Sequence, residues 1–261
     1  MGCSVMIIAK NEESNIVECM LSCSKFATQF VVIDDFSTDA TVKRIEESQF
    51  AGITNVYQRS LDGDWGGQQT YGIKACTEEW VFLIDADERC TPELAEEIYQ
   101  HVQQAPTKAY WVKRINHFAK QKVRHGTLSP DWVLRLLPQK DSYVEGRVHP
   151  KICVSVPEVR LREVMLHYTY QDWAQYERKM NLYSTLAAQK YFQERKKVSC
   201  LPIDMLFRPF LAFVKMYLLK GGFLDGTLGW VLSHQYANYT MAKYIKLAEL
   251  YRKEKAEKAG K

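Results

Sequence analysis

The sequence has no long uninterrupted hydrophobic run. A membrane-spanning helix needs ~18 or more apolar residues in succession, and charged side chains interrupt the most apolar part of this 261-residue chain at Asp204, Arg208, Lys215, Lys220 and Asp225. Residues 1–10 also lack the basic and then apolar pattern of a signal peptide. We therefore expect a chain that stays in the cytoplasm and does not cross a bilayer, although part of it can lie on one.

Metal-binding cysteine patterns and a strong excess of one charge are missing as well. The seven cysteines are scattered, without a C-x-x-C pair or the ligand spacing of a zinc site, so we expect reduced thiols. The 35 basic and 31 acidic side chains leave a net charge of only +4, which is too mild to predict nucleic-acid binding. With 46% hydrophobic residues, the chain can bury a sizeable core in one large domain or one domain with an appendage.

Apolar runs alternate with helical patterns over residues 1–90. Short β-branched and aromatic runs predict strands at 4–8, 30–34, 54–57 and 80–84. Helical patterns separate them at 11–23, 37–48 and 67–76. Alternation of this kind predicts an α/β fold with a mainly parallel sheet flanked by helices.

The pattern changes after the fourth predicted strand. We expect a helix over 92–103, capped by Thr91, and further strands at 109–115, 133–137 and 148–156. A helix over 172–197 precedes two apolar-rich helical patterns over 201–258, joined by several glycines. The first of these is amphipathic, with Asp204, Arg208 and Lys215 opposite an aromatic and aliphatic side, and it either docks on the rest of the chain or lies in a bilayer interface.

Polar clusters follow each of the first four predicted strands. They are Lys10, Asn11 and Glu12; Asp34 and Asp35; residues 62–67; and Asp85, Asp87 and Glu88. In a parallel sheet the carboxyl ends of the strands meet at one edge, where ligands bind. Several carboxylates at one edge repel each other unless a cation or a donor-rich ligand is bound.

Two acidic pairs are the strongest candidates for such a site. Asp85 and Asp87 are spaced i, i+2, so on a strand they project to the same side and can hold one divalent ion that also binds phosphate oxygens. The alternative is that Asp87 and Glu88 stabilise the start of the next helix. Asp34 and Asp35 can accept hydrogen bonds from a base or a ribose, or they can belong to a turn.

Three motifs, in this order, resemble glycosyltransferase family 2, the inverting GT-A enzymes that use nucleotide sugars. They are VMIIAKNEESNI (5–16), VVIDDFSTDAT (31–41) and VFLIDADER (81–89). Further segments are similar to the branch that adds glucose or a related hexose to the inner core of bacterial lipopolysaccharide, among them HGTLSPDWVLRLL (125–137), VEGRVHPKI (144–152) and KMYLLKGGFLDGTLGWVLS (215–233).

The resemblance covers nearly the whole chain and implies its organisation. Residues 1–170 would form the GT-A catalytic domain, with a nucleotide-sugar half at 1–90 and an acceptor half at 91–170. Residues 171–261 would form a helical region that associates with a membrane or with a second copy of the chain.

The resemblance also implies how the donor is held. Asp34 and Asp35 would bind the uridine part, with the backbone near Ala9 and Glu12 around it. A weaker donor contact falls at Gln69, where relatives often carry a basic residue and asparagine.

The resemblance implies that Asp87, helped by Asp85, would hold Mg²⁺ or Mn²⁺ on the diphosphate. Asp85 would also contact the nucleotide-sugar donor. Asp131, just before an x-x-Leu-Arg pattern, would be the catalytic base, with Glu145 as the reserve candidate. Arg135 would orient Asp131 or bind phosphate, or it would form an ordinary surface ion pair. His149 would lie near the metal or serve a structural role, and both interpretations stay open because Pro150 replaces the acidic residue common in relatives.

The implied activity is transfer of a hexose, glucose in the first instance, from a UDP-sugar to a lipid-linked lipopolysaccharide core at the cytoplasmic face of the inner membrane. Another bacterial surface glycan is the nearest alternative acceptor. A nucleotidyltransferase would have a glycine-rich loop, and residues 8–12 contain no glycine. A phosphotransfer receiver domain would place its acidic pair after the first strand. A non-catalytic membrane scaffold with the same fold is disfavoured, because the chain keeps Asp85, Asp87 and Asp131.

Overall fold

A computed structural model of the chain describes residues 1–140, 142–146, 150–196 and 203–259. The chain forms two compact units. The first comprises Met1–Ile115 and Asp131–Tyr168, and the second comprises Asn116–Pro130 and Thr169–Lys261. Two long strands, β6 (Ala109–Phe118) and β11 (Glu158–Tyr170), begin in the first unit and end in the second.

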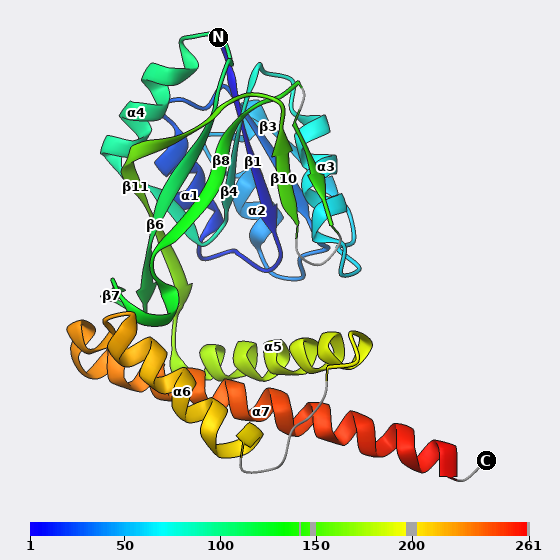
Figure 1. The fold of residues 1–261 in the computed structure, drawn as a ribbon. Coiled ribbons are helices and arrows are strands. Elements are labelled where there is room, and N and C mark those ends of the chain that lie inside the picture. The colour runs from blue at the N-terminus through cyan, green and yellow to red at the C-terminus, as the bar shows by residue number, and fades with distance from the viewer. Residues whose placement is uncertain (141, 147–149, 197–202, 260–261) are drawn as a thin grey trace. The chain divides into compact units, whose positions relative to one another are not determined.

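The first unit is built on a mixed sheet (Figure 1). Its parallel part has the order β3-β2-β1-β4 and consists of β1 (Cys3–Ala9), β2 (Gln29–Asp34), β3 (Thr54–Gln58) and β4 (Trp80–Asp85). The sheet continues through β8 (Asp131–Pro138), β6, β11 and β5 (Glu88–Cys90), and the β4-β8, β8-β6 and β11-β5 pairs are antiparallel. The predicted N-terminal strands thus form the parallel part, and the α/β prediction is confirmed.

Helices cover both faces of this sheet. The core on one face includes residues of α1 (Ile16–Cys23), α2 (Thr41–Glu46) and α4 (Pro92–Val102). The other face is covered by α3 (Trp65–Ala75) and by the hairpin of β9 (Ser142–Glu145) and β10 (Lys151–Val154). Helix α4 begins as the sequence predicts, because the Thr91 side chain accepts a hydrogen bond from the Leu94 N–H at 3.2 Å.

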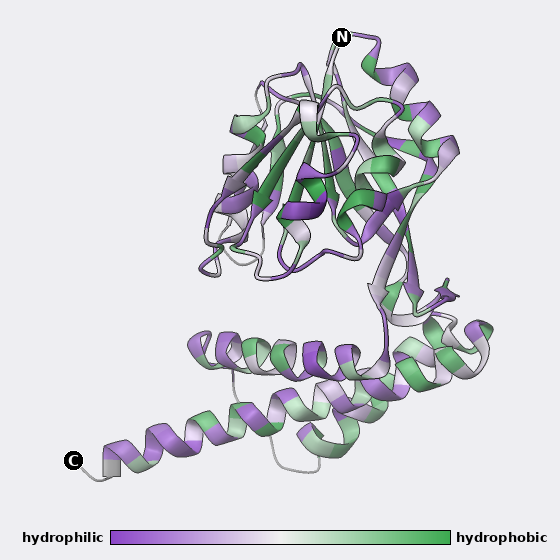
Figure 2. Ribbon diagram, turned by 180° about the vertical axis from the view of Figure 1, so that it is seen from behind, coloured by the Kyte–Doolittle hydropathy of each residue, from purple (hydrophilic) through white to green (hydrophobic). Residues whose placement is uncertain are grey.

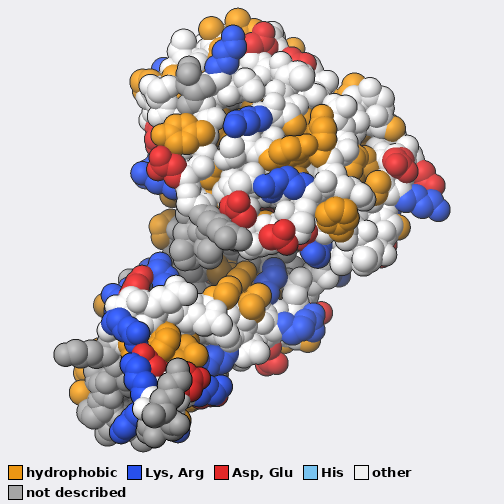
Figure 3. All heavy atoms as spheres, turned by 90° about the vertical axis from the view of Figure 1, so that its right-hand side faces the viewer, with side chains coloured by type: hydrophobic (Ala, Val, Ile, Leu, Met, Phe, Trp, Pro, Cys, Tyr) orange, Lys and Arg blue, Asp and Glu red, His pale blue; other side chains and the backbone are white. Residues whose placement is uncertain are grey.

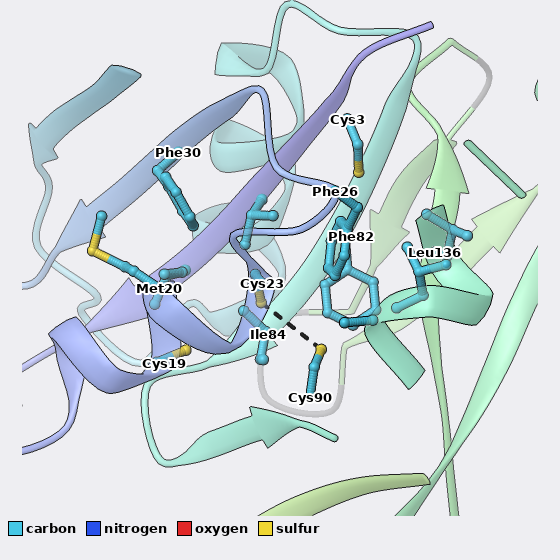
Figure 4. Packing of buried hydrophobic residues seen from close by; sticks show 14 of the residues in the cluster. Cys3, Cys19, Met20, Cys23, Phe26, Phe30, Phe82, Ile84, Cys90 and Leu136 are labelled. Carbon is cyan, nitrogen blue, oxygen red and sulfur yellow. Dashed lines mark hydrogen bonds between the residues drawn. The ribbon is translucent and has the colours of Figure 1, made fainter. Parts of the chain in front are cut away.

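The core is apolar and rich in sulfur and aromatic rings. The strands of the sheet are largely hydrophobic in Figure 2. Figure 4 shows Phe26 against Phe82, whose rings meet edge to face at 5.3 Å, and the thiols of Cys23 and Cys90 at 3.8 Å. Burial raises the pKa of the Cys90 thiol, so this sulfur stays protonated and packs as a hydrophobic group.

The second unit is mainly helical. It contains the short strand β7 (Gln121–Val123), α5 (Trp173–Gln193), α6 (Arg208–Val214) and α7 (Gly226–Ala259), and π-helical turns at Ile203–Phe207 and Lys215–Leu219 flank α6. Lys246 on α7 donates to Asn181, Ser184 and Thr185 on α5 at 2.7–2.8 Å and so ties the two helices together. Of the helices in the described part of the chain, none is long and apolar enough to cross a bilayer.

The sequence pattern misses β11 altogether. Glu158, Arg160, Arg162 and Glu163 lie within its first half and hide the apolar alternation of a strand. β8 also begins two residues earlier than its hydrophobic run, at Asp131.

Acidic and basic side chains are mixed over the side of the molecule shown in Figure 3, as the small net charge leads one to expect.

Candidate active site

The predicted polar clusters lie along one edge of the sheet in the first unit. β1, β2 and β4 end at Ala9, Asp34 and Asp85, and the strand registers pair Ala9 with Asp34 and Ile8 with Asp85. Gln58, the last residue of β3, also pairs with Asp34. Because the parallel strands end together, the loops that follow them share a single rim.

Asp34 has an unusual environment for a carboxylate. The residue is fully buried, and its Oδ2 accepts a hydrogen bond from the Ser37 N–H at 3.0 Å. Its other oxygen, Oδ1, is buried and has no hydrogen-bond partner among the described residues. A buried acceptor left unpaired costs about 1–3 kcal/mol. A ligand that donates a hydrogen bond at this point would remove that cost.

Asp35 has a different role in the loops around the rim. Lys10 Nζ lies 2.8 Å from its Oδ2, and the Leu61 N–H donates to its Oδ1 at 3.0 Å. Although desolvation opposes ionisation, these donors hold the pKa of Asp35 below its ordinary value. Since both oxygens are already bonded, Asp35 fastens the loops that follow β1 and β3.

Ala9 and Glu12, expected near the donor, lie in the same loop region. The Ala9 carbonyl accepts the Asp35 N–H at 2.9 Å. Glu12 accepts a hydrogen bond from the Asn15 side chain at 2.7 Å, and its backbone N–H donates to Thr41 Oγ1 at 2.8 Å. These bonds fix the backbone conformation that surrounds Asp34.

A network of acidic and arginine side chains follows β4. Arg135, only 5% exposed, donates to Asp85 at 2.7 Å and to Glu88 at 2.8 Å. Arg114 donates to Glu88 at 2.8 Å from the neighbouring strand β6. Arg135 therefore neither orients Asp131 nor makes a surface ion pair, because its charge is buried between Asp85 and Glu88. Its third expected role, phosphate binding, stays a prediction.

The network shifts the pKa values of its members. Desolvation raises the pKa of Asp85, but Arg135 and Arg114 outweigh it and hold the pKa below its ordinary value. For the fully buried Glu88, burial prevails and its pKa is raised. Burial alone would lower the pKa of Arg135, and the two carboxylates raise it instead. Arg135 therefore stays charged and links β8 to the turn after β4.

The interpretation of Asp87 and Glu88 as helix caps is wrong, since Thr91 caps α4. Glu88 instead accepts the Asp85 N–H at 2.9 Å. The premise that Asp85 and Asp87 project to the same side of a strand also fails, because β4 ends at Asp85 and the chain turns at Asp87. Asp85 contacts Arg135, whereas Asp87 reaches His167.

Asp87 and His167 bring two groups of metal-ligating type close together at this rim. His167 Nε2 on β11 lies 3.5 Å from Asp87 Oδ2, with the two side chains 14% and 24% exposed. No cluster of three such groups occurs within the described ranges. Ions that act on nucleotides are commonly held by one or two protein groups and by phosphate oxygens, so this pair fits a divalent ion brought in with a diphosphate. Sequence reasoning missed His167 because it missed β11.

Asp131, the predicted base, is the first residue of β8. Both of its oxygens accept from Arg114, Oδ2 from Nε at 2.8 Å and Oδ1 from Nη2 at 3.0 Å. A two-point pair of this kind fixes the plane of the carboxylate.

The remaining predicted site residues are Glu145, Gln69 and His149, and no hydrogen bond links Glu145 or Gln69 to the acidic and arginine network among the described residues. Glu145 is exposed at the end of β9, opposite Lys151 in the hairpin register. Gln69 on α3 buries its Oε1 without a hydrogen-bond partner among the described residues. A cavity of about 420 Å³ lies beside α3 and includes Arg59 and Lys74 in its lining. His149 lies outside the described residues.

Known proteins similar to this chain are glycosyltransferases. The family model described as glycosyl transferase family 2 matches residues 4–168, more than half of the chain. The lipopolysaccharide core biosynthesis glycosyltransferase LpsC of Rhizobium meliloti is 25% identical over 257 residues, covering 96% of this chain and 92% of that protein. An uncharacterized glycosyltransferase of Rickettsia conorii is 28% identical over 267 residues, covering 95% and 89%.

Among solved structures, the mannosyltransferase PcManGT from Pyrobaculum calidifontis, in complex with GDP-Man and Mn²⁺, matches with a TM-score of 0.52. The match covers 94% of this chain and 86% of that one at 14% sequence identity, so it bears on the fold alone. With its GT-A arrangement of strands and helices and a family match over most of the first unit, the chain belongs to glycosyltransferase family 2.

Proposed function

We propose that this glycosyltransferase transfers a hexose, glucose in the first instance, from a UDP-sugar to the inner core of a lipid-linked lipopolysaccharide, with inversion at the anomeric carbon. The similarity to LpsC along nearly the full length of both chains supports the acceptor class. The observation that carries the proposal is that the rim after β1, β2 and β4 combines the unpaired Asp34 oxygen with the Asp87 and His167 pair.

Asp34 is the proposed uridine contact. Its Oδ1 can accept a hydrogen bond from a uracil N–H or a ribose hydroxyl, as acidic residues at strand ends do in other nucleotide folds. We assign Asp35 the supporting task of holding the neighbouring loops through Lys10 and Leu61. Ala9 and Glu12 would contribute backbone around the base, and Gln69 a polar contact from α3.

Asp87 and His167 would hold Mg²⁺ or Mn²⁺ on the donor diphosphate. When bound, this ion stabilises the negative charge that develops on the departing diphosphate. Asp85 would act mainly through Arg135, which its carboxylate holds in place. We retain His149 as a further candidate ligand.

Asp131 is the proposed base. It would take the proton of the acceptor hydroxyl as that oxygen attacks the anomeric carbon, and a single displacement of this kind inverts the configuration. Arg114 would keep the carboxylate in one orientation through its two hydrogen bonds. Glu145 remains the reserve candidate.

The proposed organisation follows from these roles. Residues 1–170 would form the catalytic domain, with the donor half at 1–90 and the acceptor half at 91–170. Residues 171–261 would place the enzyme at the cytoplasmic face of the inner membrane, where a lipid-linked acceptor is found.

A screen of nucleotide sugars by thermal shift, with and without Mn²⁺, tests the donor assignment. A ligand that binds only the folded state raises Tm, by an amount that grows with its concentration relative to Kd. We expect UDP-glucose with Mn²⁺ to give the largest rise. If no nucleotide sugar raises Tm, the proposal is wrong, and if a GDP-sugar or another UDP-sugar prevails, the donor must be reassigned.

A further inference from the structure

The second unit exposes an unusual concentration of large hydrophobic side chains. Ten of the 25 such exposed side chains in the described chain fall between residues 203 and 230. They form what we call the C-terminal apolar face, which consists of Ile203, Leu206, Phe207, Phe210, Leu211, Leu218, Leu219, Phe223, Leu224 and Trp230. Leu206 is 70% exposed and Leu219 is 79% exposed. Singly scattered exposed hydrophobic residues are ordinary, whereas so many within one segment indicate an interaction site.

The orientation of α6 and its flanking turns is opposite to that of an ordinary surface helix. Its exposed apolar residues recur at spacings of three and four, which places them on one side of the helix. Two of its ionic residues, Asp204 and Arg208, pair with each other on the side next to α7, whereas Lys215 is exposed. Asp204 is fully buried and accepts from Arg208 Nε at 2.5 Å, while the Arg208 guanidinium lies 4.9 Å from the centre of the Tyr244 ring on α7. The Asp204 and Arg208 pair therefore lies against α7, while the apolar side chains of α6 and its flanking turns are exposed.

The exposed charged residues within 203–230 are of one sign. Residues 203–230 contain two acidic side chains, Asp204 and Asp225, and these are only 0% and 6% exposed. Asp225 accepts hydrogen bonds from the backbone N–H groups of Arg124 and His125, in the loop of residues 116–130, at 2.9 and 2.8 Å. The exposed charged residues of this segment include Lys215 and Lys220. Neither of its two carboxylates is exposed.

The loop that packs against this segment adds further positive charge. The Gly126 N–H donates to the Lys220 carbonyl at 3.0 Å, so the loop of residues 116–130 contacts this segment at Gly126. This loop contains no Asp or Glu, and it exposes Lys120, Lys122 and Arg124. The exposed cationic side chains of the loop and of the segment are thus Lys120, Lys122, Arg124, Lys215 and Lys220.

We infer that the C-terminal apolar face docks on a bilayer surface that contains anionic phospholipid, with Lys120, Lys122, Arg124, Lys215 and Lys220 at the headgroups. Aromatic and leucine side chains combined with Lys and Arg are the composition of interfacial helices. A second copy of the chain is a poorer match, because a two-fold interface brings the same patch against itself. That arrangement would oppose cation to cation without exposed carboxylates to compensate. This inference gives the proposed peripheral location a surface and a lipid class.

Co-sedimentation of the full chain with vesicles, without donor or acceptor, tests the inference separately from the proposed reaction. We expect binding to vesicles of phosphatidylcholine with 30% phosphatidylglycerol, weak binding to pure phosphatidylcholine, and loss of binding at high salt. A lysine near an anionic surface contributes about fivefold in affinity, so Lys215→Gln with Lys220→Gln should weaken binding by about 25-fold. Phe210→Ser with Leu219→Ser should weaken it at least tenfold.

A matched control comes from α5, where Leu182 and Leu186 are also exposed. Leu182→Ser with Leu186→Ser should leave vesicle binding unchanged, and all variants should keep the wild-type Tm because the altered side chains are exposed. Equal binding by the Phe210→Ser, Leu219→Ser variant, or equal binding to both kinds of vesicle, would overturn the inference. So would a dimer in light scattering that this variant dissociates while the wild type binds no vesicles, since a second copy would then cover the face.

Discussion

The two units of this chain depart from the usual separation of charge and apolar surface in different ways. In the first unit, Arg135 and Glu88 are buried beside the strand ends, where a hydrophobic core would normally continue. In the second, Asp204 and Arg208 point inward from a helix whose apolar side is exposed. Burial alone would favour neither arrangement. Each departure lies where we propose a contact, with a nucleotide sugar in one unit and with lipid in the other.

The largest expected effect comes from Asp87→Ala. Removing the carboxylate should reduce metal-dependent transfer to the background rate, because the charge developing on the diphosphate loses its stabilising ion. Product formation should be measured over a range of Mn²⁺ concentrations, with Glu93→Gln on the exposed surface of α4 as the control. Normal turnover by Asp87→Ala would contradict the proposed difference between the two units. The charged residues at the rim of the first unit would then serve its structure and not a nucleotide sugar.

The next largest effect is expected for Asp131→Asn. A positioned base contributes about 10²–10⁴-fold, so transfer should fall by that factor while the thermal shift with donor persists. The amide keeps the shape of the side chain and can still accept a hydrogen bond from Arg114. Glu145→Gln is the matched comparison, and it should transfer normally. If Glu145→Gln loses activity and Asp131→Asn does not, the base is Glu145.

Arg135→Met tests the buried network through stability. Removing one partner of a buried ion pair leaves an uncompensated charge and costs about 3–5 kcal/mol. Urea unfolding should show this loss in the free energy of unfolding. Lys43→Met removes an exposed pair with Glu47 and should change it by less than about 1 kcal/mol. Equal losses in the free energy of unfolding for the two substitutions would mean that the buried Arg135 pair contributes no more to stability than an exposed pair.

Lys10→Met should have the smallest effect. Lys10 is 58% exposed, so its pair with Asp35 contributes about 0.5 kcal/mol. Because the pKa of Asp35 is lowered on folding, its contribution is complete above the unfolded pKa of about 3.9 and is lost as the pH falls through the lower folded value. The stability difference between wild type and Lys10→Met should therefore persist from pH 7 to about pH 5 and shrink as the pH falls below the unfolded pKa of about 3.9. A difference that is constant with pH would contradict this pairing.

The sequence predicts the parallel half of the sheet well because its strands are continuous apolar runs, as in residues 30–34 and 80–84. It also places Asp34 and Asp85 at the same edge, since that follows from strand order alone. The partners of these residues depend on contacts between distant segments. Arg114 reaches Asp131 from a neighbouring antiparallel strand, and His167 reaches Asp87 from a strand whose pattern is hidden by charged residues.

The helical region shows a second limit. The spacing of Asp204 and Arg208 predicts an amphipathic helix, but periodicity does not say which side faces the protein. That depends on α7, where Tyr244 receives the Arg208 guanidinium. Asp204 and Arg208 lie on the inner side, where their charges neutralise each other.

The central claim is that Asp87, at the rim after β4, holds a divalent ion together with a nucleotide sugar. Electron paramagnetic resonance of free Mn²⁺, titrated with protein in the presence and absence of UDP-glucose, measures this directly. We predict that UDP-glucose promotes binding of one Mn²⁺ per chain and that Asp87→Ala abolishes this binding. Undiminished Mn²⁺ binding by Asp87→Ala in the presence of UDP-glucose would contradict the claim.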